Sequence, residues 1–164
     1  LRGHKHPNTN LDTFMNGVVD ASLAMQSFIC AAENTGIGCC PISQIRNNLR
    51  AVTEILSIPA GVFPIAGLAV GWPKYLEPRI SMRLPQDVVI HWDTYCEEEL
   101  ARHVDAFDKR RHEKEPITTE KQRHVDVYGA SDYCPWSENI TRQLSLPARP
   151  GFSNFLKKHG YSLD

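Results

Sequence analysis

The pattern of hydrophobic positions first outlines a long helix near the start of the chain. Apolar or small residues recur at alternating steps of four and three, the spacing that gathers side chains on one helix face: Phe14, Val18, Ala21, Met25, Phe28 and Ala32. Other apolar residues lie between them. We therefore predict a helix from Leu11 to Thr35, capped by Asp12, that is apolar on nearly all sides. Such a helix is either a buried spine or half of a dimer interface.

A glycine-containing corner follows this helix at Gly36 and Gly38. Glycine accepts the left-handed backbone that often ends a helix. We predict that Pro41 to Gln44 stay out of regular helix, with Ser43 as the N-cap of a shorter helix over residues 47–57. Backbone amides outside a helix need other partners, and an electron-rich ligand is one of them.

The rest of the chain alternates short elements with proline-containing connections. Residues 62–72 are apolar with interspersed glycines, which predicts a central strand buried on both faces. We predict an extended segment at 88–92, a polar helix at 97–114 and two short helices at 136–146 and 151–159. The inward positions predicted for the polar helix are Leu100, Val104, Phe107 and Arg111.

A basic segment, KRRHEK, closes the predicted polar helix at residues 109–114. Its simplest interpretation is a solvated helix end, where cations suit the negative end of the helix dipole. The alternative is a contact with the phosphate of a pyridine nucleotide. Both interpretations stay open.

Composition and charge narrow the functional classes. Eighteen Lys and Arg against nineteen Asp and Glu give a net charge of −1, which argues against a nucleic-acid partner. No apolar run reaches the roughly 18 residues of a membrane-spanning helix, so we expect no membrane partner and a cytoplasmic protein. Five cysteines, with Cys39 and Cys40 adjacent, favour free thiols over a disulfide framework. The length of 164 residues predicts a single domain over residues 1–164.

Two sequence segments carry a family resemblance. The string AAENTGIGCCPISQIRNNLRAVTEILSIPAGVFPIAGLAVGWP at 31–73, followed by RLP at 83–85, resembles the nitroreductase family of flavoproteins. The NADPH-dependent nitroreductase and flavin reductase branch also ends in a segment similar to WSENITRQLSLPARPGFSNFLKKHGY at 136–161. The resemblance implies an α+β fold with a small, mostly antiparallel sheet flanked by helices. It also implies a homodimer with FMN at the subunit interface, in which residues 11–35 form the long central dimer helix.

The activity implied is two-electron transfer in a ping-pong reaction. NAD(P)H would give a hydride to flavin N5, and the flavin would pass it to nitroaromatics, quinones or a second flavin. The flavin carries this chemistry, so the resemblance implies no catalytic acid or base from the protein and no metal ligand.

The family's flavin-binding motifs fall on five positions. Pro41, Ile42, Ser43 and Gln44 would lie over the flavin ring, with a backbone N–H of Ser43 or Gln44 directed at N5. A fixed donor there stabilises charge without reorganising. Arg83 would bind the flavin phosphate, for which a guanidinium is suited by its bidentate geometry.

Four departures from the family pattern matter. Ser43 and Gln44 stand where the motif usually has two glycines, and Ser81 stands where a basic residue is expected two positions before Arg83. Basic residues expected before the WS dipeptide are not matched in residues 129–134. The family's N-terminal third, which grips the flavin phosphate and ribityl chain, is also missing from the sequence.

These departures motivate an alternative, a flavin-free binding or structural homodimer of the same fold. A third hypothesis is thiol or metal chemistry through Cys39, Cys40 and the histidines, including His4 and His6.

Overall fold

The computed structural model describes residue 3 and residues 8–75 and 80–164. Its contacts divide the chain into two compact units. Unit 1 combines residues 1–77 with residues 149–164, and unit 2 is the continuous stretch 78–148. Each unit is described by itself below, and the single domain over 1–164 stays a prediction.

The described part of unit 1 contains two strands and four helical segments of α or 3-10 type, the last of which is the C-terminal helix. Its elements are α1 Leu11–Asn34, β1 Gly38–Ile42, a 3-10 helix Ser43–Asn48, α2 Leu49–Ile55, β2 Gly67–Gly71 and α7 Phe152–Lys158. The predicted long helix is confirmed to within one residue. Its cap is Asn10 rather than Asp12, because the Asn10 side chain accepts a hydrogen bond from the Thr13 N–H at 3.0 Å.

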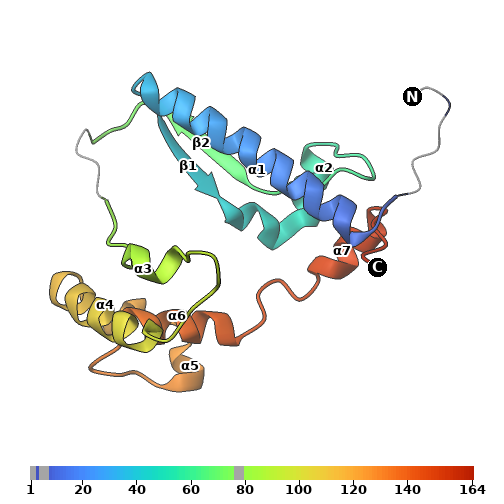
Figure 1. Cartoon of the computed structure of the whole chain (residues 1–164). Coiled ribbons are helices and arrows are strands. Elements are labelled where there is room, and N and C mark those ends of the chain that lie inside the picture. The colour runs from blue at the N-terminus through green and yellow to red at the C-terminus, as the bar shows by residue number, and fades with distance from the viewer. Residues whose placement is uncertain (1–2, 4–7, 76–79) are drawn as a thin grey trace. The chain divides into compact units, whose positions relative to one another are not determined.

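The sheet of unit 1 has two antiparallel strands. Gly38 of β1 pairs with Gly71 of β2, and Ile42 pairs with Gly67. In Figure 1 α1 runs alongside this sheet, and it contacts β1. The predicted strand buried on both faces is wrong, since the strand is shorter and Trp72 beside it is 80% exposed. Two strands and one helix do not cover both faces of an apolar strand.

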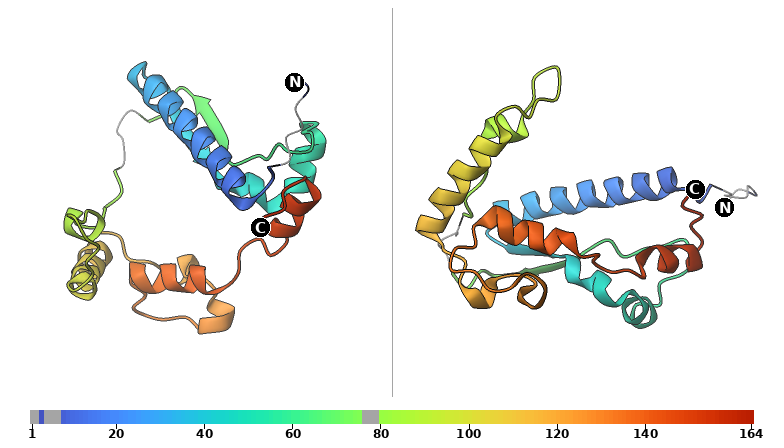
Figure 2. Two further views of the ribbon diagram at one scale, coloured as in Figure 1. Left: turned by 45° about the vertical axis from the view of Figure 1, so that its right-hand side comes forward. Right: turned by 90° about the horizontal axis from the view of Figure 1, so that it is seen from below.

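An aromatic cluster joins the start of α1 to the end of the chain. The Phe63 ring meets Phe14 and Phe152 edge-on, with ring centroids 5.5 and 5.2 Å apart. Tyr161 packs edge-on against Phe14 at 5.4 Å. These contacts place α7 beside the start of α1, as Figures 1 and 2 show.

Backbone hydrogen bonds tie the same two segments together. The Ser162 N–H donates to the Thr9 carbonyl at 2.8 Å, and the Leu11 N–H donates to the Asp164 carbonyl at 3.4 Å. The segment after α7 therefore fixes the position at which α1 begins.

Most of α1 remains open in the single chain. Only Ile29 and Ala32 of this helix are buried. Four apolar residues, each four positions after the last, form an exposed row that we call the α1 stripe: Leu11, Met15, Val19 and Leu23. Leu23 is 63% exposed. The interpretation of this helix as a buried spine is therefore wrong for the single chain, in which most of the helix is open to solvent.

The second predicted helix is shorter than expected. It spans Leu49–Ile55, and its cap is Asn48, whose side chain accepts from the Ala51 N–H at 3.1 Å. Ser43 instead opens the preceding 3-10 helix, so its predicted cap role is wrong. Leu49 of this helix is buried, whereas Ile55 is 79% exposed.

Unit 2 is built mainly from helices. Its elements are α3 Gln86–Val89, α4 Leu100–Lys114, a 3-10 helix Thr119–Lys121, α5 Val125–Tyr128 and α6 Trp136–Ser145. The extended segment predicted at 88–92 is wrong at its start, because the Val88 N–H donates to the Pro85 carbonyl and the Ile90 N–H to the Gln86 carbonyl. These local bonds close a helical turn.

The core of unit 2 lies between α4 and α6. Phe107 is 2% exposed and meets Trp136 edge-on with ring centroids 5.0 Å apart. The Cys134 thiol is fully buried. Of the inward positions predicted for α4, Phe107 is confirmed and Arg111 is half-buried, but Leu100 is exposed.

Buried polar side chains fix α6 in this core. The Asp108 carboxylate accepts hydrogen bonds from the Ser137 backbone N–H, at 3.0 Å, and from the Ser137 hydroxyl. Arg142 pairs with Glu138 at 2.7 Å and donates to the Gly129 carbonyl at 2.8 Å. The Asp108 carboxylate of α4 therefore accepts a hydrogen bond from a backbone N–H in the first turn of α6. That N–H would otherwise lack a partner.

Candidate functional site

The predicted ring-binding residues lie where β1 turns into the 3-10 helix. Pro41 and Ile42 end β1 opposite Leu68 and Gly67 of β2. Ser43 and Gln44 begin the 3-10 helix, so of the four residues predicted to stay out of regular helix, none lies in an α-helix, but only Pro41 and Ile42 lie outside a helix of any type. The first N–H groups of a helix lack an intrahelical acceptor, and among the described residues no side chain caps this end.

These residues are accessible. Pro41, Ser43 and Gln44 are exposed and Ile42 is half-buried. The left-handed backbone of Gly36, at φ 82°, ends α1 just before β1, as predicted from the glycine. The corner therefore presents the end of one strand and the opening N–H groups of a helix to a ligand.

Neighbouring contacts hold the corner in place. The Arg46 guanidinium donates to the Ile65 carbonyl. A Cβ on Gly67 would lie 3.1 Å from the Ile45 side chain, tighter than ordinary contact. The close approach of β2 to the 3-10 helix therefore favours glycine at this position, because a larger residue would have to displace the Ile45 side chain.

Arg83, the predicted phosphate ligand, lies in unit 2. It is exposed and lines a cavity of about 490 Å³ beside α4 and α6. The cavity is lined by Ser81, Met82, Arg83, Leu84, Val89, Phe107, Arg111 and Trp136. Because Arg83 and residues 41–44 belong to different units, the two parts of the predicted site are described separately.

A second guanidinium lines the same cavity. Arg111 of α4 has a side chain that is 23% exposed, and its Nη2 lies 3.6 Å from the Glu115 carboxylate. Its Nε is buried and has no hydrogen-bond partner among the residues that the structure describes. The sequence placed Arg111 inward but gave no sign that it lines a cavity with Arg83.

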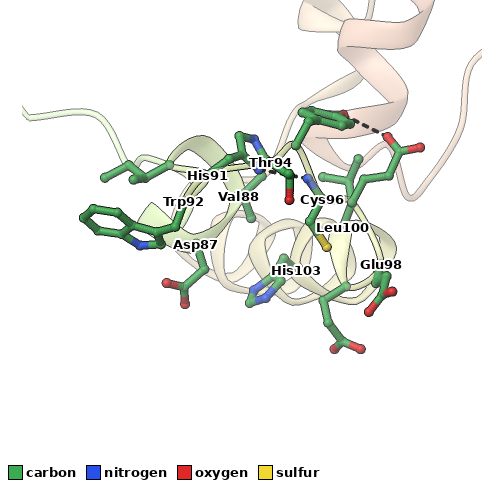
Figure 3. Close-up of a pocket in the computed structure, with 13 residues that line it drawn as sticks. Asp87, Val88, His91, Trp92, Thr94, Cys96, Glu98, Leu100 and His103 are labelled. Atoms are coloured by element: carbon green, nitrogen blue, oxygen red, sulfur yellow. Dashed lines mark hydrogen bonds between the residues drawn. The ribbon is translucent and has the colours of Figure 1, made fainter.

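A further cavity, of about 420 Å³, lies between α3 and the start of α4 (Figure 3). The ring of His91 lies 4.7 Å from that of Tyr95, and the His91 Nδ1 is 3.4 Å from the Cys96 N–H. The Tyr95 hydroxyl donates to Glu97 at 2.9 Å, and this bond raises the pKa of the exposed tyrosine. In Figure 3 the Trp92 side chain extends to one side.

The chemistry of this cavity differs from that around Arg83. Glu97, Glu98 and Glu99 line it, and no lysine or arginine is among the described residues of its lining. It is therefore unsuited to a phosphate. Sequence reasoning missed it, since its only local signal is the aromatic and acidic run from His91 to Glu99.

The thiols lie at separate places in the fold. All five cysteines are free, with Cys40 and Cys96 exposed and Cys134 buried. Burial raises the pKa of the Cys134 thiol. Over the described part of the chain, no three His, Cys, Asp or Glu side chains are grouped to hold a metal ion. His4 and His6 lie outside the described residues.

In the described ranges 8–75 and 80–164, no helix combines the length and the apolar character that crossing a membrane requires.

Two family models match the chain. The model of the nitroreductase family matches residues 3–72, and the model of the nitroreductase family C-terminal domain matches residues 81–164, just over half of the chain.

Individual relatives match nearly the whole chain. The FMN reductase (NAD(P)H) of Bacillus subtilis is 31% identical over 100% of this chain and 63% of its own length. The oxygen-insensitive NADPH nitroreductase of Salmonella typhimurium is 35% identical over 89% of this chain and 56% of its own length. The chain thus spans less than two thirds of these relatives.

A solved structure agrees with the fold. The NfrA1 nitroreductase of Bacillus subtilis superposes with a TM-score of 0.80 at 30% identity, covering 98% of this chain and 62% of that protein. The predicted α+β fold with a small antiparallel sheet is confirmed by this likeness and by the pairing of β1 with β2.

Proposed function

Because the chain belongs to the nitroreductase family, we propose that it is an FMN-dependent oxidoreductase. It passes a hydride from NAD(P)H through flavin N5 to nitroaromatics, quinones or flavins in a ping-pong reaction. The observation that carries the proposal is the match of both family models, together with relatives named as an FMN reductase and an NADPH nitroreductase. When bound, FMN supplies the hydride chemistry, and the chain's own residues bind and orient it.

The ring contact rests on the corner at residues 41–44. Among the described residues no side chain caps the opening N–H groups of this 3-10 helix, and the residues Ser43 and Gln44 are exposed. A donor held by the backbone does not reorganise during reaction, so it can favour negative charge at the flavin N5 position. Pro41 and Ile42 supply apolar surface for the flat ring.

The phosphate contact rests on the cavity at Arg83. Arg111 lines the same cavity, and the lining includes no Asp or Glu among the residues that the structure describes. A cavity with these groups fits an anion. We propose Arg83 as the phosphate ligand, which agrees with the role implied by the RLP motif.

A homodimer is supported by the α1 stripe. Its four apolar side chains are exposed along a helix of 24 residues. A row of this length is unusual on a monomer surface and favours a second copy of the same helix as its cover. We propose that α1 is the central dimer helix.

The test is the absorption spectrum of the purified protein before and after addition of FMN. Flavin bands that co-elute with the protein, followed by bleaching with NADH or NADPH and recovery with a quinone, are the expected result. Protein that stays colourless after FMN is added would overturn the proposal.

The alternative function is a flavin-free binding or structural homodimer. Ser43 and Gln44, in place of the usual glycines, favour it because their side chains crowd the flavin edge. The same experiment separates the two: a stable dimer that takes up no FMN supports the alternative. Bound flavin excludes it.

A further inference from the structure

We propose that Arg111 and Arg83 together form a phosphate-monoester site, in which Arg111 replaces the cation missing at Ser81. The inference rests on the proposed function and assigns the site to the phosphate of FMN. It predicts a second arginine ligand on α4, far along the sequence from the RLP motif.

The first support is shared placement. Arg83 comes from the extended segment before α3, and Arg111 comes from α4, yet both line the cavity of about 490 Å³. Ser81 lines the same cavity. The lost basic residue and the proposed substitute therefore border one space.

The second support is the way in which Arg111 is held. Phe107 precedes it by one helical turn on the same face and is buried against Trp136. Asp108 binds Ser137 at the start of α6. These contacts fix α4 against α6, so they hold the backbone from which the Arg111 side chain extends.

The third support is the donor capacity of Arg111. Arginine has five N–H donors, and Arg111 approaches Glu115 through Nη2 at a distance of 3.6 Å, beyond normal hydrogen-bond length. Its Nε is buried without a partner among the described residues. The buried Nε has no accessible surface, so a contact from the cavity would use the terminal nitrogens of this side chain, which is 23% exposed.

The fourth support is the charge of the lining. Arg83 and Arg111 both line a cavity whose described lining has no carboxylate, and the Glu115 carboxylate 3.6 Å from the Arg111 Nη2 offsets part of their charge. A phosphate monoester carries close to two negative charges near pH 7, which matches two arginines. The apolar side chains of Leu84, Phe107 and Trp136 line the same cavity, whereas Arg83 itself is exposed to solvent.

The exposed neighbour Arg110 provides a matched control. It lies on the same helix and carries the same charge, but it does not line the cavity. Arg110→Gln removes one positive charge from α4 without touching the proposed site. Any effect of net charge alone would appear equally in both variants.

The experiment compares binding of FMN with binding of riboflavin, which lacks the phosphate, by flavin fluorescence in the full chain. We expect Arg111→Gln to weaken FMN binding by about 10-fold or more, the loss of one charge-assisted contact, and to leave riboflavin binding within about 2-fold. Arg111→Lys should restore part of the loss, and Arg110→Gln should change neither affinity. Equal affinity of wild type and Arg111→Gln for FMN would overturn the inference and leave the proposed function intact.

A second measurement needs no flavin. Inorganic phosphate should raise the thermal midpoint of the wild type and of Arg110→Gln more than that of Arg111→Gln or Arg111→Lys. A wild type that binds no flavin contradicts the proposed function, and this phosphate shift then decides the site by itself. Equal shifts in all four proteins would show an adventitious ion only and overturn the inference.

A third comparison separates two sources of the same chemistry. NADPH carries a phosphate monoester that NADH lacks. If Arg111→Gln weakens NADPH binding while leaving FMN binding unchanged, the site takes the nucleotide, and the assignment to FMN is wrong.

Discussion

Units 1 and 2 differ in how completely they bury their apolar side chains and pair their polar ones. Unit 2 buries Phe107 and Cys134 completely and pairs its buried Asp108 and Arg142 within the unit. Unit 1 has a half-exposed aromatic cluster and an α1 helix with an open apolar stripe. The difference indicates that unit 2 closes its core within the single chain, whereas unit 1 leaves a large part of its apolar surface open.

The two proposed cofactor contacts also differ between the units, because one uses backbone groups and the other uses side chains. The corner in unit 1 offers backbone N–H groups, whose direction is set by β1 and the 3-10 helix. The cavity in unit 2 offers the side-chain charges of Arg83 and Arg111. Substitutions therefore change the second contact directly, but they change the first only through the backbone.

The largest expected effect is on the core of unit 2. Phe107→Ala should lower the free energy of unfolding by ~3–5 kcal/mol, because it removes a buried ring and leaves a cavity. Urea denaturation followed by circular dichroism measures it. Leu100→Ala on the exposed start of the same helix is the control and should cost less than about 1 kcal/mol. Equal losses would place the core of unit 2 elsewhere.

The next effect concerns the α1 stripe. Leu23→Asp puts a charge into the proposed dimer contact and should weaken dimerisation about 100-fold, or ~3 kcal/mol. Light scattering during size-exclusion chromatography over a range of concentrations measures it. Ala31→Asp adds the same charge on another side of the helix, given about 3.6 residues per turn, and should leave the dimer intact. A dimer unaffected by Leu23→Asp would contradict the proposed interface.

A smaller effect is expected at the junction of α4 and α6. Asp108→Ala removes the carboxylate that satisfies the start of α6 and should cost ~1–3 kcal/mol. Thermal and urea unfolding measure it, with the exposed Asp105→Ala on the same helix as control. No difference between the two variants would show that the Ser137 contacts contribute nothing to the stability of unit 2.

The smallest effect is expected at the vicinal thiols. Replacing Cys39 and Cys40 together by alanine should change stability by less than about 1 kcal/mol, since both are partly or fully exposed. Reductase turnover should stay within about 2-fold if the flavin carries the chemistry. Abolished turnover with FMN still bound would instead support the thiol hypothesis.

Local patterns predicted the helices better than the strands. The limits of α1 followed from its apolar spacing, and α4, α6 and α7 were placed within a few residues. The segment 62–72 was misinterpreted because an apolar run has the same pattern whether its own chain or another surface covers it. The cap at Asn48 was missed because Asn48 and Ser43 are both favourable cap residues.

The site was predictable only where its residues are close in sequence. Pro41 to Gln44 form one motif, so a resemblance could identify them together. Arg111 was placed inward from its spacing to Phe107, but its cavity with Arg83 depends on how α4 packs against α6. That packing rests on the Asp108 and Ser137 contacts, which are side-chain pairings that no periodicity reports.

The hydrogen bonds from Ser162 to Thr9 and from Leu11 to Asp164 have a consequence for the order of folding. Unit 2 is continuous in sequence, whereas unit 1 joins two segments that flank it. During synthesis, all of unit 2 leaves the ribosome before residues 149–164 can close unit 1. The closure spans a long loop and is slow for an unfolded chain. Unit 1 is therefore expected to form later than unit 2.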